Sequence, residues 1–455
     1  MESNNNTTTG LIYGVEDRPP LRDALFAAIQ HLLAIFVAII TPPLIIAKSL
    51  GLDLALTGFL VSMSLFVSGI ATFVQCRRIG KVGCGMLCVQ GTSFSFIGPI
   101  IAIGMVSGLP TVFGACICAA PVEMIVSYTF RYLRRIITPL VSGIVVMLIG
   151  LSLLKAGVTS CGGGNAAAAD FGSLRNLGVA AIVLVCVILF NVSRNKYLRM
   201  SSIFLGVVVG YVVAFLMGMV DLSALDNSTL GSFYVPIPFK MGIDVNLSSV
   251  IAIGIVYLVT AIEATGDVTA NSLISGLSVE GKEYVKRVSG GVLADGVNSA
   301  FAGVFSSFPN SIFAQNNGII QLTGVASRYV GYYIAAMLVL LGLFPVVGVA
   351  FSLMPSPVLG GATLLMFGTV AAAGVRIVAS QPIDRKATLV LACSLAFGMG
   401  VELMPGILQN MSDSVRTIFS SGITTGGLTA ILANAVLNGF GKEQKKEIKP
   451  NNSEK

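Results

Sequence analysis

Several carboxylates lie inside long apolar runs of this sequence, where a charged side chain is unfavourable and therefore indicates a specific role. Glu263 and Asp267 stand four residues apart in A-I-E-A-T-G-D, and Asp295 follows in G-G-V-L-A-D-G. On a helix, residues four apart share one face. Burying an ionised carboxylate is costly unless it is paired. These side chains are therefore candidates for binding a ligand or a proton, and the structural alternative is that they hold helices together.

Three adjacent amides, Gln315, Asn316 and Asn317, form a second polar group in an apolar run. A carboxylate such as Glu263 accepts hydrogen bonds from ring N–H groups, and the Gln315 amide both donates and accepts. Phe94, in Q-G-T-S-F-S-F-I-G-P, offers a ring face for stacking. This set of residue types favours recognition of a planar heterocycle.

Further titratable groups fall in the same kind of run. The only histidine, His31, is, like Asp267 and Asp295, a candidate for holding or moving a proton or for supporting the site. Glu123 and Glu402 each stand alone in the sequence, and we interpret both as structural.

Enzyme and metal motifs are missing from the sequence. It contains no G-x-S-x-G, H-E-x-x-H or P-loop pattern. None of its eight cysteines forms a C-x-x-C pair, and most lie in apolar runs, where they are expected to serve packing. We therefore expect no catalysis, no cofactor and no metal site, but binding and transport of a small molecule, energised by an ion gradient.

Composition indicates which elements position these groups. The 455 residues include 28 Lys+Arg and 21 Asp+Glu, so 11% are charged, against about 25% in soluble domains. Hydrophobic residues make up 55%, and the mean hydropathy is +0.87. Apolar stretches of about 20 residues predict an all-α polytopic membrane protein rather than a barrel. The first 22 residues are polar, and no cleavage site follows them, so the first span is expected to be retained.

The apolar runs predict fourteen transmembrane spans. They cover residues 23–50, 54–76, 83–104, 108–130, 137–156, 177–193, 202–221, 247–275, 287–308, 311–326, 329–350, 356–375, 387–405 and 420–438. Placing both termini in the cytoplasm puts nearly all basic residues on the cytoplasmic side, as the positive-inside rule requires. Of the 28 lysines and arginines, the outer segments hold only Lys48, Lys155, Arg175, Lys240 and Arg416. Because the basic residues are spread over many loops, the net charge of +7 does not indicate binding of nucleic acid.

An internal repeat relates the two halves of the chain. Pro139-L-V-S-Gly143-I-V-V-M-L-I-Gly150 aligns without gaps with the segment that starts at Pro357 and contains Gly361. The offset is 218 residues, because 357 − 139 = 218. The two segments open spans 5 and 12, which cross in opposite directions. This predicts two inverted repeats of seven spans.

Spans 3 and 10 correspond to each other in the two repeats, and both are poor continuous helices. Residues 90–99 and 308–318 contain Gly, Pro, Asn, Ser and Thr, which break helices. Irregular backbone in a membrane is tolerated only where it lines a cavity or is buried in protein. We therefore predict a short extended segment followed by a half-helix in each span, with the two helix N-termini facing an electron-rich ligand.

At these residues the sequence resembles the nucleobase–ascorbate transporter family, also called nucleobase:cation symporter-2. The family signature Q/E-N-x-G-x-x-x-x-T-R/K/G is matched by Gln315-Asn316-Asn317-Gly318-I-I-Q-L-Thr323-Gly324. The pair Gln30-His31 and the carboxylates of spans 8 and 9 match as well, and the similarity runs along nearly the whole chain. E-D-R-P-P at 16–20 and Y-L-R-R-I-I-T-P at 132–139 resemble bacterial xanthine permeases in particular.

The resemblance implies a fold, an activity and a set of site residues. It implies a core domain (23–130 and 247–350), a gate domain (131–246 and 351–441) and cytoplasmic tails (1–22 and 442–455). It implies proton-coupled uptake of a purine, most of all xanthine, through the bacterial inner membrane by alternating access. The substrate-binding residues would be Glu263, Gln315, Phe94, Ser93 and Asn316, and Asp295, Asp267 and His31 would couple protons or support the site.

Several alternatives stay open from the sequence. Some xanthine permeases have Asn where this chain has Ser93, so xanthine alone and xanthine plus urate are both compatible with the pattern. A uracil permease is a further alternative, although Gln315 favours purines because uracil carriers tend to have Glu there. An anion transporter of the same seven-plus-seven fold and a membrane-embedded enzyme are rivals from other classes. The oligomeric state is open, with a homodimer among the alternatives.

Overall fold

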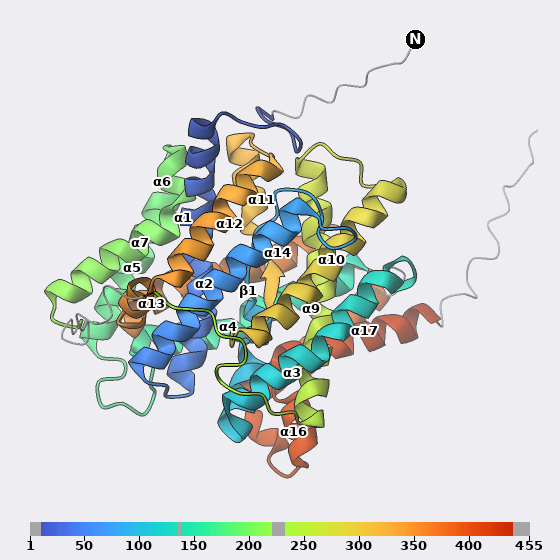
Figure 1. Ribbon diagram of the computed structural model, residues 1–455. Coiled ribbons are helices and arrows are strands. Elements are labelled where there is room, and N and C mark those ends of the chain that lie inside the picture. Colours follow the sequence, from blue (N-terminus) through green and yellow to red (C-terminus); the bar gives the residue numbers. More distant parts are fainter. Residues whose placement is uncertain (1–10, 134–137, 221–232, 440–455) are drawn as a thin grey trace, which may run out of the picture.

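Helices dominate the molecule. The computed structural model describes residues 11–133, 138–220 and 233–439, which form helices and two short strands (Figure 1). In chain order the elements are α1 (Leu21–Ser49), α2 (Leu54–Arg77), β1 (Gln90–Thr92), η1 (Phe94–Phe96), α3 (Ile97–Leu133), α4 (Pro139–Gly162), α5 (Leu174–Val192), α6 (Lys196–Met200), α7 (Ser202–Leu216), α9 (Leu247–Ile274), α10 (Gly281–Val304), β2 (Asn310–Ile312), α11 (Gln315–Thr323), α12 (Arg328–Leu343), α13 (Pro345–Ser352), α14 (Ser356–Val378), α15 (Arg385–Leu403), η3 (Pro405–Leu408), α16 (Asp413–Phe419) and α17 (Gly422–Gly439). The predicted C-terminal tail from residue 442 and the first ten residues lie outside the described residues.

Every predicted span maps onto one or more of these elements. Within the described residues, eight helices are long and apolar enough to cross a membrane, or up to nine if the bent pair α12–α13 is one span. Two shorter apolar helices, Ser202–Leu216 and Gly422–Leu437, add to them. The chain is thus a mostly helical, multi-pass protein, while fourteen crossings stay a prediction.

The start of the third predicted span is not helical. Residues 83–89 form a buried, irregular segment, in which Gly83 (φ 108°) and Gly85 (φ 73°) adopt backbone conformations that favour glycine. Gln75 of α2 supplies hydrogen bonds that a helix would otherwise provide. Its carbonyl oxygen accepts from Gly85 N at 2.9 Å, and its Oε1 accepts from Cys84 N at 3.0 Å. The apolar run therefore predicted the burial of this segment correctly but not its backbone conformation.

Two further breaks differ from the prediction of separate straight spans. The third and fourth predicted spans continue into one another as α3, which is broken at Gly108 (φ 78°, ψ 174°). The predicted span 329–350 divides into α12 and α13, which meet at 76°. Pro345 begins α13 and has no N–H to continue the hydrogen bonding of α12.

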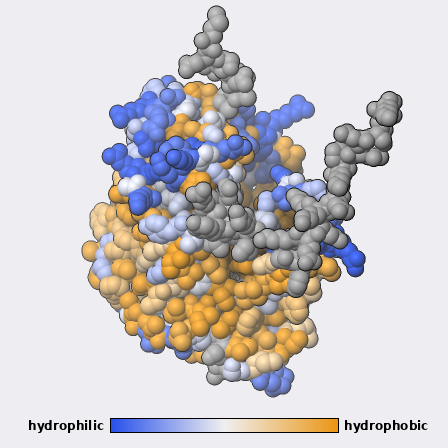
Figure 2. Space-filling model, turned by 90° about the vertical axis from the view of Figure 1, so that its right-hand side faces the viewer, coloured by the Kyte–Doolittle hydropathy of each residue, from blue (hydrophilic) through white to orange (hydrophobic). Residues whose placement is uncertain are grey.

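Several large apolar residues on α5 and α7 are exposed on the protein surface. Leu174 and Val192 of α5 are 90% and 78% exposed, and Leu216 of α7 is 77% exposed. A soluble protein rarely shows such a surface, whereas a bilayer solvates it. Figure 2 shows apolar residues over much of one face, while hydrophilic residues gather toward one end.

α4 and α14, which carry the two copies of the internal repeat, pack against each other in antiparallel directions. Gly143 lies against Val378, and Gly150 lies against Ala371. A Cβ added at Gly150 would come within 2.3 Å of the Ala371 backbone nitrogen. The repeat glycines therefore allow the two helices to touch through their backbones.

The N-terminal segment 11–18 lies along the turn between α11 and α12. Ile12 N and Tyr13 N donate to the Gly324 carbonyl oxygen at 2.7 and 3.1 Å. Arg328 forms a salt bridge with Glu16, with 2.7 Å between Nη2 and Oε2. This part of the predicted tail is therefore attached to the end of the Gln315 signature segment.

Candidate functional site

The two half-helices predicted from the breaks at residues 90–99 and 308–318 begin at a pair of short strands. β1 and β2 pair antiparallel, with Gln90 opposite Ile312 and Thr92 opposite Asn310, and both are fully buried (Figure 1). β1 leads through η1 into α3, and β2 leads into α11. The close approach requires Gly91, because an added Cβ would come within 2.6 Å of the Phe313 ring. The predicted extended segments are confirmed at both positions.

α9 brings the first carboxylate to this junction. Its N-terminus is capped by Asn246, whose side chain accepts from Ser248 N, and the helix packs against η1, β2 and α11. Glu263, partly buried on α9, accepts a hydrogen bond from Ser95 Oγ to its Oε2 at 3.3 Å. The carboxylate thus lies at the start of the α3 half-helix, against the residue that follows Phe94 in the chain.

The Phe94 ring of η1 contacts α14. It meets Phe367 of α14 edge to face, with 5.5 Å between ring centroids. Phe367 is buried, whereas Phe94 is partly exposed. Phe94 therefore keeps part of its side chain exposed.

The three signature amides are held differently. Asn316 Nδ2 donates to the Leu87 carbonyl oxygen at 2.6 Å, and Asn317 Nδ2 donates to the Asp267 carbonyl oxygen at 3.4 Å. Gln315, the first residue of α11, is partly exposed, and its side chain forms no hydrogen bond within the described residues. Gln315 is thus the amide left free to bind a ligand, while Asn316 and Asn317 fasten α11 to its surroundings.

His31 is fully buried on α1, and its ring lies beside the Asn316 side chain. Neither ring nitrogen has a hydrogen-bond partner of normal geometry within the described residues. His31 thus lies close to the signature segment without a fixed hydrogen bond to it.

Asp295 belongs to a separate cluster between α10 and α2. Its Oδ1 accepts from Gln75 Nε2 at 3.2 Å, and the same Nε2 donates to the Gly291 carbonyl oxygen at 2.9 Å. Asp295 is fully buried and makes no hydrogen bond to Glu263. The structure thus does not bring the two carboxylates into one hydrogen-bonded site, although Glu263 acts on Asp295 electrostatically.

Ser93 lies at the end of β1 and before η1. Its backbone N–H donates to the Pro309 carbonyl oxygen at 2.9 Å, and its side chain makes no capping bond to η1. The hydroxyl is buried without a partner within the described residues. Ser93 therefore does not act as a side-chain cap of η1.

The two carboxylates interpreted as structural both have partners. Glu123 Oε1 accepts from Thr260 Oγ1 at 3.1 Å, which links α3 to α9. Glu402 Oε2 accepts from Gly422 N at 3.2 Å, which links α15 to α17. No group of three or more His, Cys, Asp or Glu suited to a metal lies in the described part of the chain.

Sequence reasoning missed four residues that shape this region. Ser95 donates a hydrogen bond to Glu263, and Gln75 donates one to Asp295. Asn271 donates one to the Leu87 carbonyl oxygen at 2.8 Å. Ser95 stands in the segment already singled out, and Gln75 and Asn271 are amides at the ends of apolar runs, so polarity was an available signal. Phe367, the fourth, lies in an apolar run and gave no signal.

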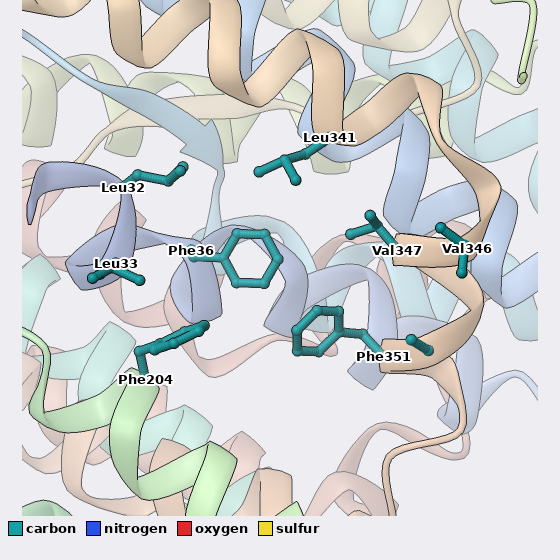
Figure 3. A pocket seen from close by; sticks show the side chains of 9 residues that line it. Leu32, Leu33, Phe36, Phe204, Leu341, Val346, Val347 and Phe351 are labelled. Carbon is teal, nitrogen blue, oxygen red and sulfur yellow. The ribbon is translucent and has the colours of Figure 1, made fainter. Parts of the chain in front are cut away.

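An apolar cavity of about 400 Å³ lies between α1, α7, α12 and α13. Figure 3 shows Phe36, Phe204 and Phe351 turned toward it, together with leucines and valines. Its lining offers no hydrogen-bonding side chain, so it does not suit a polar heterocycle.

The fold is that of multi-pass membrane transporters. A solved structure of SLC26A9 matches with a TM-score of 0.63 at 12% identity, covering 93% of this chain and 66% of that chain. The transmembrane domain of a cyanobacterium bicarbonate transporter, BicA, matches with a TM-score of 0.53 at 13% identity, covering 93% and 100%. At such identities the likeness concerns the fold alone.

The sequence comparisons define the family. A model described as the Permease family matches residues 22–407, and the chain belongs to this family, that of the nucleobase–ascorbate transporters. It is 49% identical to xanthine permease XanP of Escherichia coli K12, over 94% of each chain. It is 45% identical to xanthine permease XanQ of the same strain, over 96% of each chain. It is 34% identical to uric acid permease PucJ of Bacillus subtilis, over 92% of this chain and 93% of the relative.

These findings decide between the classes left open by the sequence. The resemblance based on the Gln315 signature is confirmed, and the protein is a multi-pass inner-membrane transporter of this family rather than an enzyme. The anion-transporter alternative has a likeness in fold only, whereas the permeases match in sequence along nearly the whole chain.

Proposed function

We propose that this protein takes up a purine base, above all xanthine, together with protons, by alternating access. The observation that carries the proposal is the arrangement at the paired strands. There the Glu263 carboxylate accepts from Ser95, which follows the partly exposed Phe94 in the chain, and the Gln315 amide at the start of the other half-helix has no hydrogen-bond partner within the described residues. The xanthine permeases to which the chain is similar give the same substrate class.

Each of these groups has a chemical counterpart in an oxopurine. The Glu263 carboxylate would accept from ring N–H groups, in charge-assisted hydrogen bonds stronger than those of neutral groups. The Gln315 amide would donate to an oxo group and accept from a ring N–H. Phe94 would pack on the ring face, and the N-termini of the half-helices would favour the electron-rich oxygens.

Alternating access would move a core domain (23–130 and 247–350) against a gate domain (131–246 and 351–441). The antiparallel contact of α4 and α14 supports inverted repeats related by the offset of 218 residues. Applying that offset to the contact of Gly143 with Val378 predicts a contact between residues 361 and 160, because 143 + 218 = 361 and 378 − 218 = 160. The neighbouring Gly360 lies against Ser160 and Cys161, a contact that is compatible with a two-fold axis between the repeats and that the antiparallel register of the two helices also gives.

Proton coupling is assigned to the buried groups around the site. Asp267 Oδ2, Asp295 Oδ2 and the ring nitrogens of His31 have no hydrogen-bond partner within the described residues. Each therefore has room for a proton without losing an existing bond. Asp295 is the leading candidate, because Gln75 connects it to α2. A change of its charge would therefore alter the contact between α10 and α2.

We also propose that both termini lie in the cytoplasm, because nearly all basic residues then lie on the cytoplasmic side.

Uptake of labelled xanthine tests the proposal directly. Cells that express the protein should accumulate xanthine, and a protonophore should abolish the accumulation. Glu263→Ala should remove uptake while the amount of protein in the membrane stays unchanged, with the exposed Glu280→Ala as the matched control. Accumulation that resists the protonophore would contradict the coupling, and absence of xanthine uptake would contradict the substrate.

Urate is a second candidate substrate. The buried Ser93 hydroxyl lies one residue before Phe94 and has no partner within the described residues, and the chain is also similar to a uric acid permease. Urate carries one more oxo group than xanthine, and a pocket rejects an added polar group mainly through lack of space or of a partner. Ser93 offers such a partner, so we propose weaker recognition of urate beside xanthine.

A further inference from the structure

A second cavity lies beyond the start of the α3 half-helix, away from the Glu263 site. It measures about 570 Å³ and lies between α1 and α3 on one side and α4, α14 and α15 on the other. Ile97 and Gly98, which directly follow η1, form part of its lining, whereas Glu263 and Gln315 do not. Because Lys48 in the last turn of α1 also lines it, the cavity lies toward the end of α1 opposite to the N-terminal segment.

This cavity is lined by three charged side chains, those of Lys48, Lys155 and Glu402. The Lys48 ammonium donates to the Met354 carbonyl oxygen at 2.9 Å and to Ser356 Oγ at 3.1 Å. An ammonium has three donors, and these two neutral acceptors leave one for a ligand. No carboxylate lies within salt-bridge distance of Lys48 in the described part of the chain.

Glu402 and Lys155 also line the cavity. Glu402 is partly buried, its Oε2 accepts from Gly422 N at 3.2 Å, and the Ser152 hydroxyl lies beside its carboxylate. Because a carboxylate has about four acceptor positions, it can still accept from a ligand. Lys155 is exposed and acts on Glu402 electrostatically without forming a salt bridge. The cavity therefore combines hydrogen-bond donors on two lysines with a carboxylate acceptor, beside the hydroxyls of Ser49, Ser152, Thr159, Ser160, Ser420 and Ser421.

We propose that this cavity is an outer docking subsite, in which Lys155 and Lys48 donate to the oxo groups of an oxopurine and Glu402 accepts from a ring N–H before the base reaches Glu263. The inference rests on the proposed function, because it assigns the same substrate to a second position on the path. The volume lies within the range of small-molecule sites. A simple inorganic anion suits the cavity less well, because the Glu402 carboxylate would repel it and would find no N–H to accept from.

The subsite predicts a change in apparent affinity rather than in maximal rate. Lys155→Gln should raise the KM for xanthine by about tenfold, because one charge-assisted hydrogen bond is lost, while the maximal rate stays within about twofold. Glu402→Gln should raise the KM in the same sense. Lys155→Arg should restore most of the affinity, because a charged donor is kept. Lys240→Gln is the matched control, because Lys240 is exposed, lies over the Phe59 ring and does not line the cavity.

Ligand protection separates the subsite from the Glu263 site. Thr159→Cys places a thiol in the cavity lining, and a membrane-impermeant thiol reagent should label it above the background of the parent chain. Xanthine should slow this labelling even in the Glu263→Gln background, where the inner site no longer binds. If xanthine slows the labelling of Thr159→Cys in the Glu263→Gln background, and no longer does so once Lys155→Gln is added, the subsite is established.

Two outcomes would overturn the proposal without affecting the transport function. One is that xanthine slows the labelling of Thr159→Cys when Glu263 is present but has no effect on it in the Glu263→Gln background. The other is a KM for Lys155→Gln equal to that of the Lys240→Gln control. Failure of the parent chain to take up xanthine at all would instead overturn the proposed substrate, and the two failures are therefore distinguishable.

Discussion

Glu263 and Asp295 are both carboxylates inside apolar helices, yet the structure gives them opposite surroundings. Glu263 is partly exposed and receives a hydrogen bond from the Ser95 hydroxyl, a group that can rotate away. Asp295 is fully buried and receives a bond from Gln75, whose amide is held in turn by Gly291 and the Cys84 N–H. One carboxylate can exchange its partner for a ligand, whereas the other is fixed in a network.

The difference shows that ligand binding and proton coupling require different surroundings for a carboxylate in a membrane protein. A ligand-binding carboxylate must be reachable and must not satisfy all its lone pairs within the protein. A carboxylate that couples protonation to helix movement must instead be bound to more than one helix, so that its change of charge alters their contact. Asp295 and Gln75 connect α10 and α2 in this way.

Glu263→Ala is expected to have the largest effect. It removes charge-assisted hydrogen bonds that contribute about 1.5–3 kcal/mol each, so xanthine uptake should fall below detection. Because Ser95 is the only hydrogen-bond donor to Glu263 within the described residues, the fold should tolerate the change, and the amount of inserted protein should match that of Glu280→Ala. Transport at the parental rate would mean that Glu263 only holds helices together and does not bind the substrate.

Asp295→Asn should separate coupling from binding. The asparagine Oδ1 can still accept from Gln75, so the hydrogen bond survives while the titrating group is lost. Concentrative uptake should disappear, whereas exchange of labelled for unlabelled xanthine across the membrane should persist. Concentrative uptake with the parental pH dependence would transfer the coupling role to His31 or Asp267.

Gln315→Glu should change selectivity more than activity. The free amide both donates and accepts, and a carboxylate in its place only accepts, so an oxo group of xanthine loses its donor. Xanthine affinity should fall by about tenfold, and the order in which purines and uracil compete for uptake should change. An unaltered competition profile would show that Gln315 does not face the substrate. Gln321→Glu, the same change at an exposed position of the same helix, is the control.

Ser93→Asn is expected to have the smallest effect. A larger side chain would fill the space around the buried hydroxyl, and inhibition of xanthine uptake by urate and 8-methylxanthine should weaken several-fold while xanthine uptake stays close to parental. Ser95→Asn is the comparison variant, because it disturbs the Glu263 bond and should impair xanthine itself. Identical inhibition profiles before and after Ser93→Asn would place this residue outside the substrate cavity.

Much of this description follows from the sequence because it depends on local chemistry. Sparse charge and long apolar runs required a helical membrane protein, since only helices satisfy the backbone of such runs in lipid. Clusters of Gly, Pro, Ser and Asn at residues 90–99 and 308–318 located the two breaks, because these residues disfavour continuous helix wherever they occur. The Gln315 signature and the carboxylates Glu263, Asp267 and Asp295 gave the family and the candidate site.

Tertiary structure decided which of those candidates act together. Nothing in the order of residues shows that Ser95 reaches Glu263, that Gln75 holds Asp295, or that Phe367 meets Phe94, because each pair joins helices far apart in the chain. The irregular backbone of residues 83–89 depends likewise on amides from α2, α9 and α11. Apolar patterning fixes that a segment is buried, but the partner that satisfies a buried polar group is chosen only when the helices pack.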